Sequence, residues 1–148
     1  MIKRAGRADL PEILALQKLA FLSEAEIYGD YTIPPLTQTL EALEQDFVSQ
    51  VILKETGNGK ITGSVRGFET QPGVCYIGRL IVHPDHQNKG IGKKLMESIE
   101  ACFPHCSRFV LSTGSKSLKN IRLYKSLGYS ITREEIINDA LTLVHLEK

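Results

Sequence analysis

The residues best suited to chemistry form one short segment between a predicted strand and a predicted helix. The segment follows Leu80-Ile81-Val82-His83-Pro84 and consists of Gln87, Asn88, Lys89, Gly90, Ile91, Gly92 and Lys93. The first N–H groups of a helix have no main-chain acceptor, and they carry the positive end of the helix dipole. Glycines here let an anion approach those groups, and the lysines add positive charge. This segment, which we call the glycine cradle, is predicted to bind a phosphate group.

Two familiar phosphate-binding motifs do not fit the glycine cradle. A Walker A loop would require Gly at position 87 and Ser or Thr at position 94, where the chain has Gln87 and Lys94. The dinucleotide-binding fingerprint would require a third small residue where the chain has Leu95. What remains is Gln-x-x-Gly-x-Gly behind a strand that ends Leu-Ile-Val-x-Pro. An ordinary glycine-rich helix start in a charged loop is the alternative.

The elements that must position the cradle are read from periodicity and turn residues. Apolar residues at helical spacing, such as Ile91, Leu95 and Ile99, predict helices over residues 9–22, 37–47, 91–103 and 118–127. Alternating or short apolar runs predict strands over residues 2–6, 51–53, 60–69, 74–82, 109–111, 129–137 and 140–146. Residues 23–36 are expected to be irregular. The order predicts an α+β domain, in α/β three-layer form, with a mixed sheet.

Two local features refine this prediction. Asp9 and Glu12 have the spacing of a capping box, so Asp9 is expected to cap the first helix. The alternation of the strand 74–82 gives way to consecutive apolar residues at Leu80-Ile81-Val82. Such a break predicts either a β-bulge or a strand end that is buried on both faces.

Composition limits the class of protein. The chain has 148 residues, of which 42% are apolar, and 18 Lys and Arg against 17 Asp and Glu give a net charge of +1. This length fits one domain, residues 1–148, and the near-neutral charge argues against nucleic acid as a partner. No apolar run approaches the ~18 residues of a membrane span, and the first residues lack the apolar core of a signal peptide. We expect a cytoplasmic monomer or homodimer with no membrane partner.

Cysteine usage agrees with that location. Cys75, Cys102 and Cys106 are too few and too unevenly placed for a disulfide framework. Cys102 and Cys106 flank His105, but a zinc site needs about four ligands and no second pair stands nearby. We therefore expect buried thiols around a helix end and no metal.

Two segments together resemble the GNAT superfamily of acetyl-CoA-dependent N-acetyltransferases. The first is Arg79–Leu95, and the second is Asn120–Tyr129, whose Leu123-Tyr124-x-x-x-Gly128-Tyr129 is similar to the family's Leu-Tyr-x-x-x-Gly-aromatic signature. The element order resembles the family along nearly the whole chain. The resemblance implies a mixed, mostly antiparallel sheet that splays after the fourth strand and is flanked by helices.

By the same resemblance, the chain would bind acetyl-CoA. The backbone of Leu80, Ile81 and Val82 would pair with the pantetheine arm, and residues 88–93 would hold the pyrophosphate. Many family members bind the arm through an Asn where this chain has Ser117, and Asn120 is the candidate replacement. The implied cofactor residues are Leu80, Ile81, Val82, Gln87, Asn88, Lys89, Gly90, Ile91, Gly92, Lys93, Ser117 and Asn120.

The resemblance implies that Tyr124 is the catalytic residue, near the thioester sulfur. A primary amine would attack the thioester directly, without a covalent enzyme intermediate, and a backbone N–H such as that of Val82 would stabilise the oxyanion. A tyrosine of pKa ~10 can protonate the leaving thiolate. The alternative is that Tyr124 is a core aromatic, packed with Leu118 and Ile121. An acyl-CoA-binding module without catalysis would keep the cradle and lose this acid.

The sequence gives only candidates for the acceptor side. The family's Glu base is replaced by Ser112, and Glu69 and Tyr76 are the candidates to reach the acceptor amine instead. The irregular segment 23–36 is expected to border the cleft. It offers an acidic and aromatic rim, typical of a site for a cationic amine, although a solvated loop is the alternative. The rim residues are Glu24, Glu26, Tyr28, Asp30 and Tyr31.

Overall fold

One seven-stranded sheet organises the chain, and the computed structural model describes all of residues 1–148. Its strands run in the order β1-β2-β3-β4-β5-β7-β6, and all neighbours are antiparallel except the parallel pair β4 and β5. This confirms the predicted mixed, mostly antiparallel sheet. The strands are β1 (Ile2–Arg4), β2 (Val51–Gly57), β3 (Lys60–Gln71), β4 (Val74–Val82), β5 (Arg108–Gly114), β6 (Ser130–Ile136) and β7 (Thr142–Glu147).

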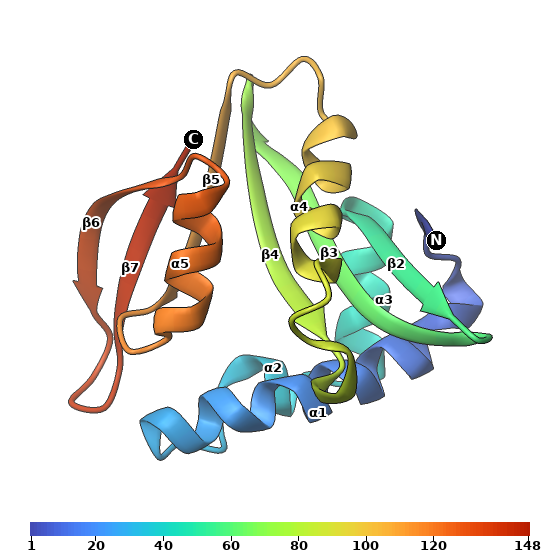
Figure 1. The fold of residues 1–148 in the computed structure, drawn as a ribbon, viewed down its shortest axis with the longest axis horizontal. Helices are drawn as coiled ribbons and strands as arrows, with labels where there is room; N and C mark the ends of the chain where they lie inside the picture. Colours follow the sequence, from blue (N-terminus) through green and yellow to red (C-terminus); the bar gives the residue numbers. More distant parts are fainter.

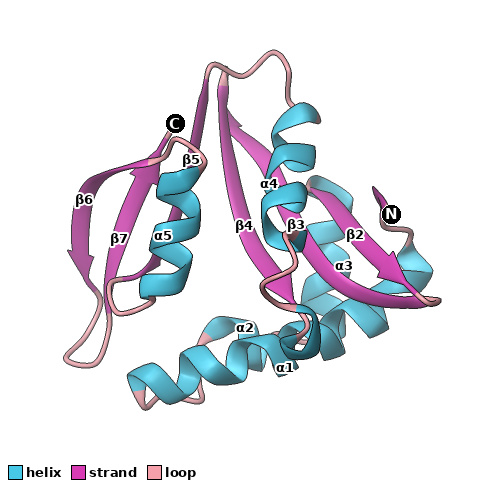
Figure 2. Ribbon diagram, viewed as in Figure 1, coloured by secondary structure: helices cyan, strands magenta, loops and turns pink.

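Helices cover both faces of the sheet and one of its ends. They are α1 (Leu10–Tyr28), α2 (Pro34–Thr37), α3 (Leu40–Ser49), α4 (Ile91–Ala101) and α5 (Leu118–Ser126). Helices α4 and α5 lie on one face, α3 lies on the other, and α1 crosses below the ends of the strands (Figures 1 and 2). None of these helices combines the length and the apolar character that crossing a membrane requires.

Each face has its own hydrophobic core. Leu95, Met96 and Ile99 of α4 and Ile121 of α5 pack with strand residues in the larger core, and all four are buried. A smaller core joins α1 and α3 to the opposite face through apolar residues spaced three or four apart. Its buried members are Leu10, Ile13, Leu16, Leu43, Ile52, Ile61 and Ile81.

The first helix differs from the prediction at both ends. It continues to Tyr28 because no glycine or proline interrupts it before Gly29, whose φ of 62° ends the helix in a left-handed conformation. The expectation of an irregular segment from residue 23 was therefore wrong. The capping box was also wrong, because Glu12 accepts a hydrogen bond from the backbone N–H of Ile61 at 2.8 Å. Asp9 accepts from the N–H of Gly6 and from Lys54 instead of capping α1.

Strands β4 and β5 part soon after they meet. Only three residue pairs join them, and the last is Tyr76 with Val110. Beyond that pair the two strands diverge toward α1, which crosses the open end of the gap (Figure 1). The predicted splay after the fourth strand is thus confirmed, and we call the gap the β4–β5 split.

The break in alternation along β4 is a β-bulge. The register with β3 shifts between Ser64, which pairs with Ile81, and Arg66, which pairs with Gly78. Arg79 lies inside this shift and has a φ of 50°, which is unusual for a residue other than glycine. After the bulge, Leu80 packs against the larger core and Ile81 joins the smaller one. The strand end is therefore both bulged and buried on two faces.

Candidate functional site

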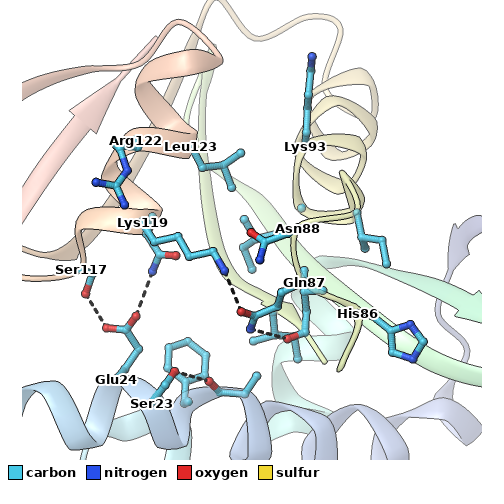
Figure 3. Close-up of a pocket in the computed structure, with 18 of the residues that line it drawn as sticks. Ser23, Glu24, His86, Gln87, Asn88, Lys93, Ser117, Lys119, Arg122 and Leu123 are labelled. Atoms are coloured by element: carbon cyan, nitrogen blue, oxygen red, sulfur yellow. Dashed lines mark hydrogen bonds between the residues drawn. The ribbon is translucent and has the colours of Figure 1, made fainter. Parts of the chain in front are cut away.

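A cavity of about 610 Å³ lies where the β4–β5 split opens toward α1. Its walls come from the second half of α1, the end of β4, the glycine cradle and α5 (Figure 3). Of the residues predicted to bind the cofactor, every one except Lys89 lines this cavity. Two segments separated by a whole helix and a strand, the cradle and Ser117–Asn120, therefore face the same space.

The glycine cradle presents unpaired N–H groups to the cavity. The first main-chain hydrogen bond of α4 runs from the N–H of Lys94 to the carbonyl of Gly90 at 3.1 Å, so the N–H groups of residues 91–93 have no intrahelical acceptor. Asn88 and Gly90 have φ values of 62° and 82°. Left-handed residues at alternate positions turn successive N–H groups to one side and so form a concave anion site.

The two cradle glycines have different roles. Gly90 is the left-handed residue before α4, and a side chain there would meet no atom within 4 Å but would strain the backbone. Gly92 lies in the helix, where a Cβ would stand 3.4 Å from Leu123 and 3.8 Å from Val82. That Cβ would occupy the space between β4 and α5. Gly90 thus shapes the loop, and Gly92 keeps the cavity open.

The free edge of β4 offers a further donor. The N–H of His83 points to β3, because it donates to the carbonyl of Thr62 at 2.8 Å. Successive N–H groups of a strand point to opposite edges, so the N–H of Val82 points into the β4–β5 split. No strand pairs with β4 at that level. An extended ligand with amide groups could therefore pair with this edge as an added strand.

Polar contacts cross the mouth of the cavity. Lys119 on α5 donates to Oε1 of Gln87 in the cradle at 2.9 Å, and Nε2 of Gln87 donates to the carbonyl of Val82 at 3.3 Å (Figure 3). Lys93 and Arg122 also line the cavity. Although the chain as a whole is nearly neutral, basic side chains are concentrated where the cradle N–H groups lie.

The carboxylate of Glu24 closes the cavity from the side of α1. It accepts hydrogen bonds from Oγ of Ser117 and, at 3.2 Å, from Nδ2 of Asn120 (Figure 3). Tyr28, one helical turn further, has its hydroxyl 2.8 Å from the same Ser117 oxygen. The sequence prediction placed Glu24 on an open rim and missed these contacts. The i, i+4 spacing of Glu24 and Tyr28 was the available signal that both share one helix face.

Tyr124 lies beside the cavity rather than in its wall. The side chain is buried, and its ring lies 6.1 Å from that of Tyr129. Its hydroxyl has no hydrogen-bond partner in the chain. If that oxygen were also inaccessible to solvent, it would be a buried unpaired atom, but Arg79 Nε is the only such side-chain N or O atom. The hydroxyl of Tyr124 therefore keeps an opening. Burial raises the pKa of Tyr124 well above its usual value, and the nearby charges of Glu24 and Tyr76 raise it further.

The remaining predicted acceptor residues are scattered. Tyr76 is half-buried on β4 beside Phe68, with ring centroids 5.6 Å apart, whereas Tyr31 is 59% exposed. Asp30 uses its carboxylate to bind Thr32, and Glu26 is exposed. The predicted acidic rim is therefore reduced to Glu24.

Glu69 lies at the end of the sheet away from the cavity. It pairs with Cys75 at the start of β4, accepts from the N–H of Gly73 at 2.9 Å and contacts Nε2 of His105 at 2.9 Å. The structure does not bring this carboxylate to the acceptor side. One carboxylate oxygen of Glu69, one ring nitrogen of His105 and the sulfur of Cys106 all lie within 4.8 Å of one another.

The thiols differ in part from expectation. Cys75 and Cys106 are buried, but Cys102 is exposed, because its position at the end of α4 leaves the side chain on the solvent side. Burial raises the pKa of Cys75 to about 12. This thiol therefore stays protonated at neutral pH, as expected for a cysteine that packs rather than reacts.

Solved structures of other proteins share this architecture. A putative acetyltransferase from Salmonella typhimurium, solved with its cofactor acetyl-CoA, superposes with a TM-score of 0.76 at 24% identity, covering 100% of this chain and 92% of that one. A GNAT family acetyltransferase from Elizabethkingia anophelis with acetyl-CoA bound gives 0.75 at 20% identity, covering 99% and 95%. Both structures contain acetyl-CoA, and both share the fold of this chain.

Sequence relatives agree with the fold. The L-methionine sulfoximine/L-methionine sulfone acetyltransferase of Salmonella typhimurium is 29% identical over 90% of this chain and 81% of its own. An L-amino acid N-acyltransferase of Escherichia coli is 27% identical over the same shares. The profile of the Acetyltransferase (GNAT) family matches residues 11–129, from the start of α1 to the end of the Tyr124 signature. Cradle, split sheet and sequence profile thus agree, and the chain belongs to the GNAT family of acetyltransferases.

Proposed function

We propose that this enzyme transfers the acetyl group of acetyl-CoA to a primary amine by direct attack of the amine. The observation that supports this most is the single cavity shared by the glycine cradle and the free edge of β4. Acetyl-CoA supplies an activated acyl thioester. The N–H groups of residues 91–93 and the Lys93 side chain would hold its pyrophosphate, and the N–H of Val82 would pair with its arm.

Glu24 is the group in the cavity best suited to receive the proton of the amine. A lysine-like amine has a pKa of about 10.4, so nearly all of it is protonated at neutral pH and must lose a proton before it attacks. Glu24 lies in the cavity, and its charge reaches Tyr124. A carboxylate there attracts the ammonium form and accepts its proton, directly or through water.

Tyr124 would act on the departing sulfur. Its raised pKa keeps the hydroxyl protonated at neutral and mildly alkaline pH. A thiolate with a conjugate acid near ~8.5 is a weaker base than such a tyrosinate. Tyr124 therefore stabilises the developing sulfur charge mainly by donating a hydrogen bond. The ammonium loses one proton to Glu24 or water before attack, and the second proton that leaves its nitrogen as the amide forms balances the CoA thiol.

Two measurements in sequence test this function. Calorimetric titration with acetyl-CoA measures binding, and release of free thiol with a panel of primary amines measures transfer. Binding with amine-dependent thiol release supports the proposal. Binding without thiol release for every amine would instead identify a non-catalytic acyl-CoA-binding module, and absence of binding by the folded protein would overturn both functions.

A further inference from the structure

Two arginines lie side by side on neighbouring strands under α1 and α3, and only one has partners. Arg66 of β3 binds Asp46 of α3 at 2.7 Å and Gln38 at 3.2 Å, and it also donates to Gln17 of α1. Its side chain is only 4% exposed. Arg66 is therefore a structural cation whose charge and donors are satisfied within the chain.

Arg79 of β4 has no such partners. It takes part in none of the ion pairs or side-chain hydrogen bonds of the molecule, and its Nε is sealed from solvent without an acceptor. Asp46 lies near enough to influence Arg79, but it is already bound by Arg66 and by Nε2 of Gln38, each at 2.7 Å. Burial lowers the pKa of Arg79, yet an arginine in a protein stays charged. A half-buried positive charge is thus left without a counter-ion, and the two terminal nitrogens of its guanidinium remain accessible.

Arg79 lies at an unusual backbone position. Arg79 occupies the left-handed position of the β4 bulge, with a φ of 50°. A conformation of this kind costs free energy in a residue other than glycine, and such positions concentrate at functional sites. The bulge turns Arg79 toward the α1 and α3 face, where Asp46, Arg66 and Tyr76 are its charged or titratable neighbours. The chain therefore holds an unpaired cation at a strained position.

The location of Arg79 fits the acceptor end of the reaction. Leu80, the next residue, lines the cavity. An arm that begins at the cradle and follows β4 back from Val82 brings its acyl end to Leu80. Tyr76 lies near both Arg79 and Tyr124, since its charge influences each of them. Arg79 and Tyr124 thus lie on opposite faces of the sheet, and Tyr76 is a neighbour of both.

We propose that Arg79 binds a carboxylate of the acceptor, and that the acceptor is accordingly an amino acid or a similar small molecule with both an amine and a carboxylate. The guanidinium fork donates two parallel N–H groups and matches the two oxygens of a carboxylate. This inference rests on the proposed function. One relative is named an L-amino acid N-acyltransferase and another an L-methionine sulfoximine/L-methionine sulfone acetyltransferase, and these names support the inference.

Matched acceptors test the role of the carboxylate. Each protein amino acid is assayed beside its amide, which keeps the side chain and the amine but loses the negative charge. An α-amino group next to an amide has a pKa of only ~7.7–8.0, so at about pH 8 the amide holds more neutral amine and chemistry alone favours it. A higher kcat/KM for the free acid than for its amide supports the proposal. An equal or higher kcat/KM for the amide overturns it.

Variants of Arg79 test the residue. Asn tolerates the left-handed backbone, so Arg79→Asn removes the charge with little added strain. We expect kcat/KM for the free acid to fall by about 10- to 100-fold, mainly through KM, and kcat/KM for the amide to change little. Arg79→Lys keeps the charge without the fork and is expected to recover part of the loss. Arg7→Gln is the matched control, because it removes an exposed arginine paired with Glu44. Equal losses for acid and amide in Arg79→Asn would overturn the proposal.

A binding measurement separates this inference from the proposed function. The protein loaded with CoA is titrated calorimetrically with the same amino acids and amides, and the thermal midpoint of each variant is recorded. Binding of acids but not amides, lost in Arg79→Asn at an unchanged midpoint, supports the anion site even if no acetyl transfer occurs. Transfer to neutral amines without preference for acids sustains the proposed function and overturns the inference. Failure of every amino acid to bind also overturns it.

Discussion

The carboxylate of Glu24 accepts a hydrogen bond from the hydroxyl of Ser117, which lies 93 residues further along the chain. This contact joins α1 to the first residue before α5 across the open end of the β4–β5 split. Ser117 is itself buried. A residue expected to bind the cofactor arm is thus held in place by a residue expected to meet the acceptor.

Replacement of Glu24 by glutamine tests its charge. Gln can accept from Nδ2 of Asn120 with its amide oxygen and donate to Oγ of Ser117 with its amide N–H, so the local structure is expected to survive. Loss of the negative charge should raise KM for the amine by roughly tenfold, and loss of the proton acceptor should lower kcat by about 100-fold. The Kd for acetyl-CoA should change much less. Glu26→Gln is the control, because Glu26 is an exposed acidic residue on the same helix. An unchanged KM and kcat in Glu24→Gln would remove Glu24 from the amine site.

Replacement of Gly92 by valine tests the cradle. The added side chain would fill the space between Val82 and Leu123, where the cofactor arm is proposed to enter. Affinity for acetyl-CoA should fall by at least about 100-fold, equivalent to ~2.7 kcal/mol. Gly92 has an ordinary helical backbone, so it is a cleaner test than Gly90, where any side chain adds backbone strain. Wild-type affinity measured by calorimetry on the folded variant would refute the assignment of the cradle.

Tyr124→Phe removes one hydroxyl and keeps the ring against Tyr129. Because that hydroxyl makes no hydrogen bond within the chain, the thermal midpoint should hardly move. If the hydroxyl assists departure of the thiolate, kcat should fall by about 100-fold, the lower end of the effect of a general acid. The Kd for acetyl-CoA should stay within about threefold. Wild-type turnover, with chemistry shown to limit the rate, would make Tyr124 a packing residue.

The same tyrosine predicts a pH profile. A pKa raised above the usual ~10 means that Tyr124 is protonated through the neutral and mildly alkaline range. Activity should therefore rise with pH as the amine loses its proton, with no decline caused by Tyr124 up to about pH 10. The measurement is kcat/KM from about pH 6 to pH 10 for wild type and Tyr124→Phe. A descending limb present only in the wild type would contradict the raised pKa.

The pair of Arg66 and Asp46 predicts a loss of stability. Asp46→Ala leaves the buried guanidinium of Arg66 without its carboxylate, which typically costs about 3–5 kcal/mol. We expect about 3 kcal/mol, since the Asp46 side chain is 31% exposed. Glu44→Ala breaks the exposed pair with Arg7 and should cost less than about 1 kcal/mol. Urea unfolding of both variants gives the comparison, and equal midpoints would contradict it.

Local signals in the sequence predicted the cradle and the sheet. Gly90 and Gly92 are recognisable because few residues tolerate a left-handed turn followed by close approach of a ligand, and the run Leu80-Ile81-Val82 marked the bulge. Glu24 and Arg79 could not be placed in this way. Their roles depend on which distant groups already have partners, and a single sequence does not reveal that Asp46 is occupied by Arg66.

Helix α1 crosses the open end of the β4–β5 split and contacts the segment between β5 and α5. Its Tyr28 bonds Ser117 and the N–H of Lys116, and it lies so close to Gly114 that a Cβ there would collide with the Tyr28 hydroxyl. Beyond the last residue pair of β4 and β5, the width of the β4–β5 split is thus set by side chains of α1. No main-chain hydrogen bond joins β4 to β5 at this level, so the separation of the two strands there depends on where α1 lies.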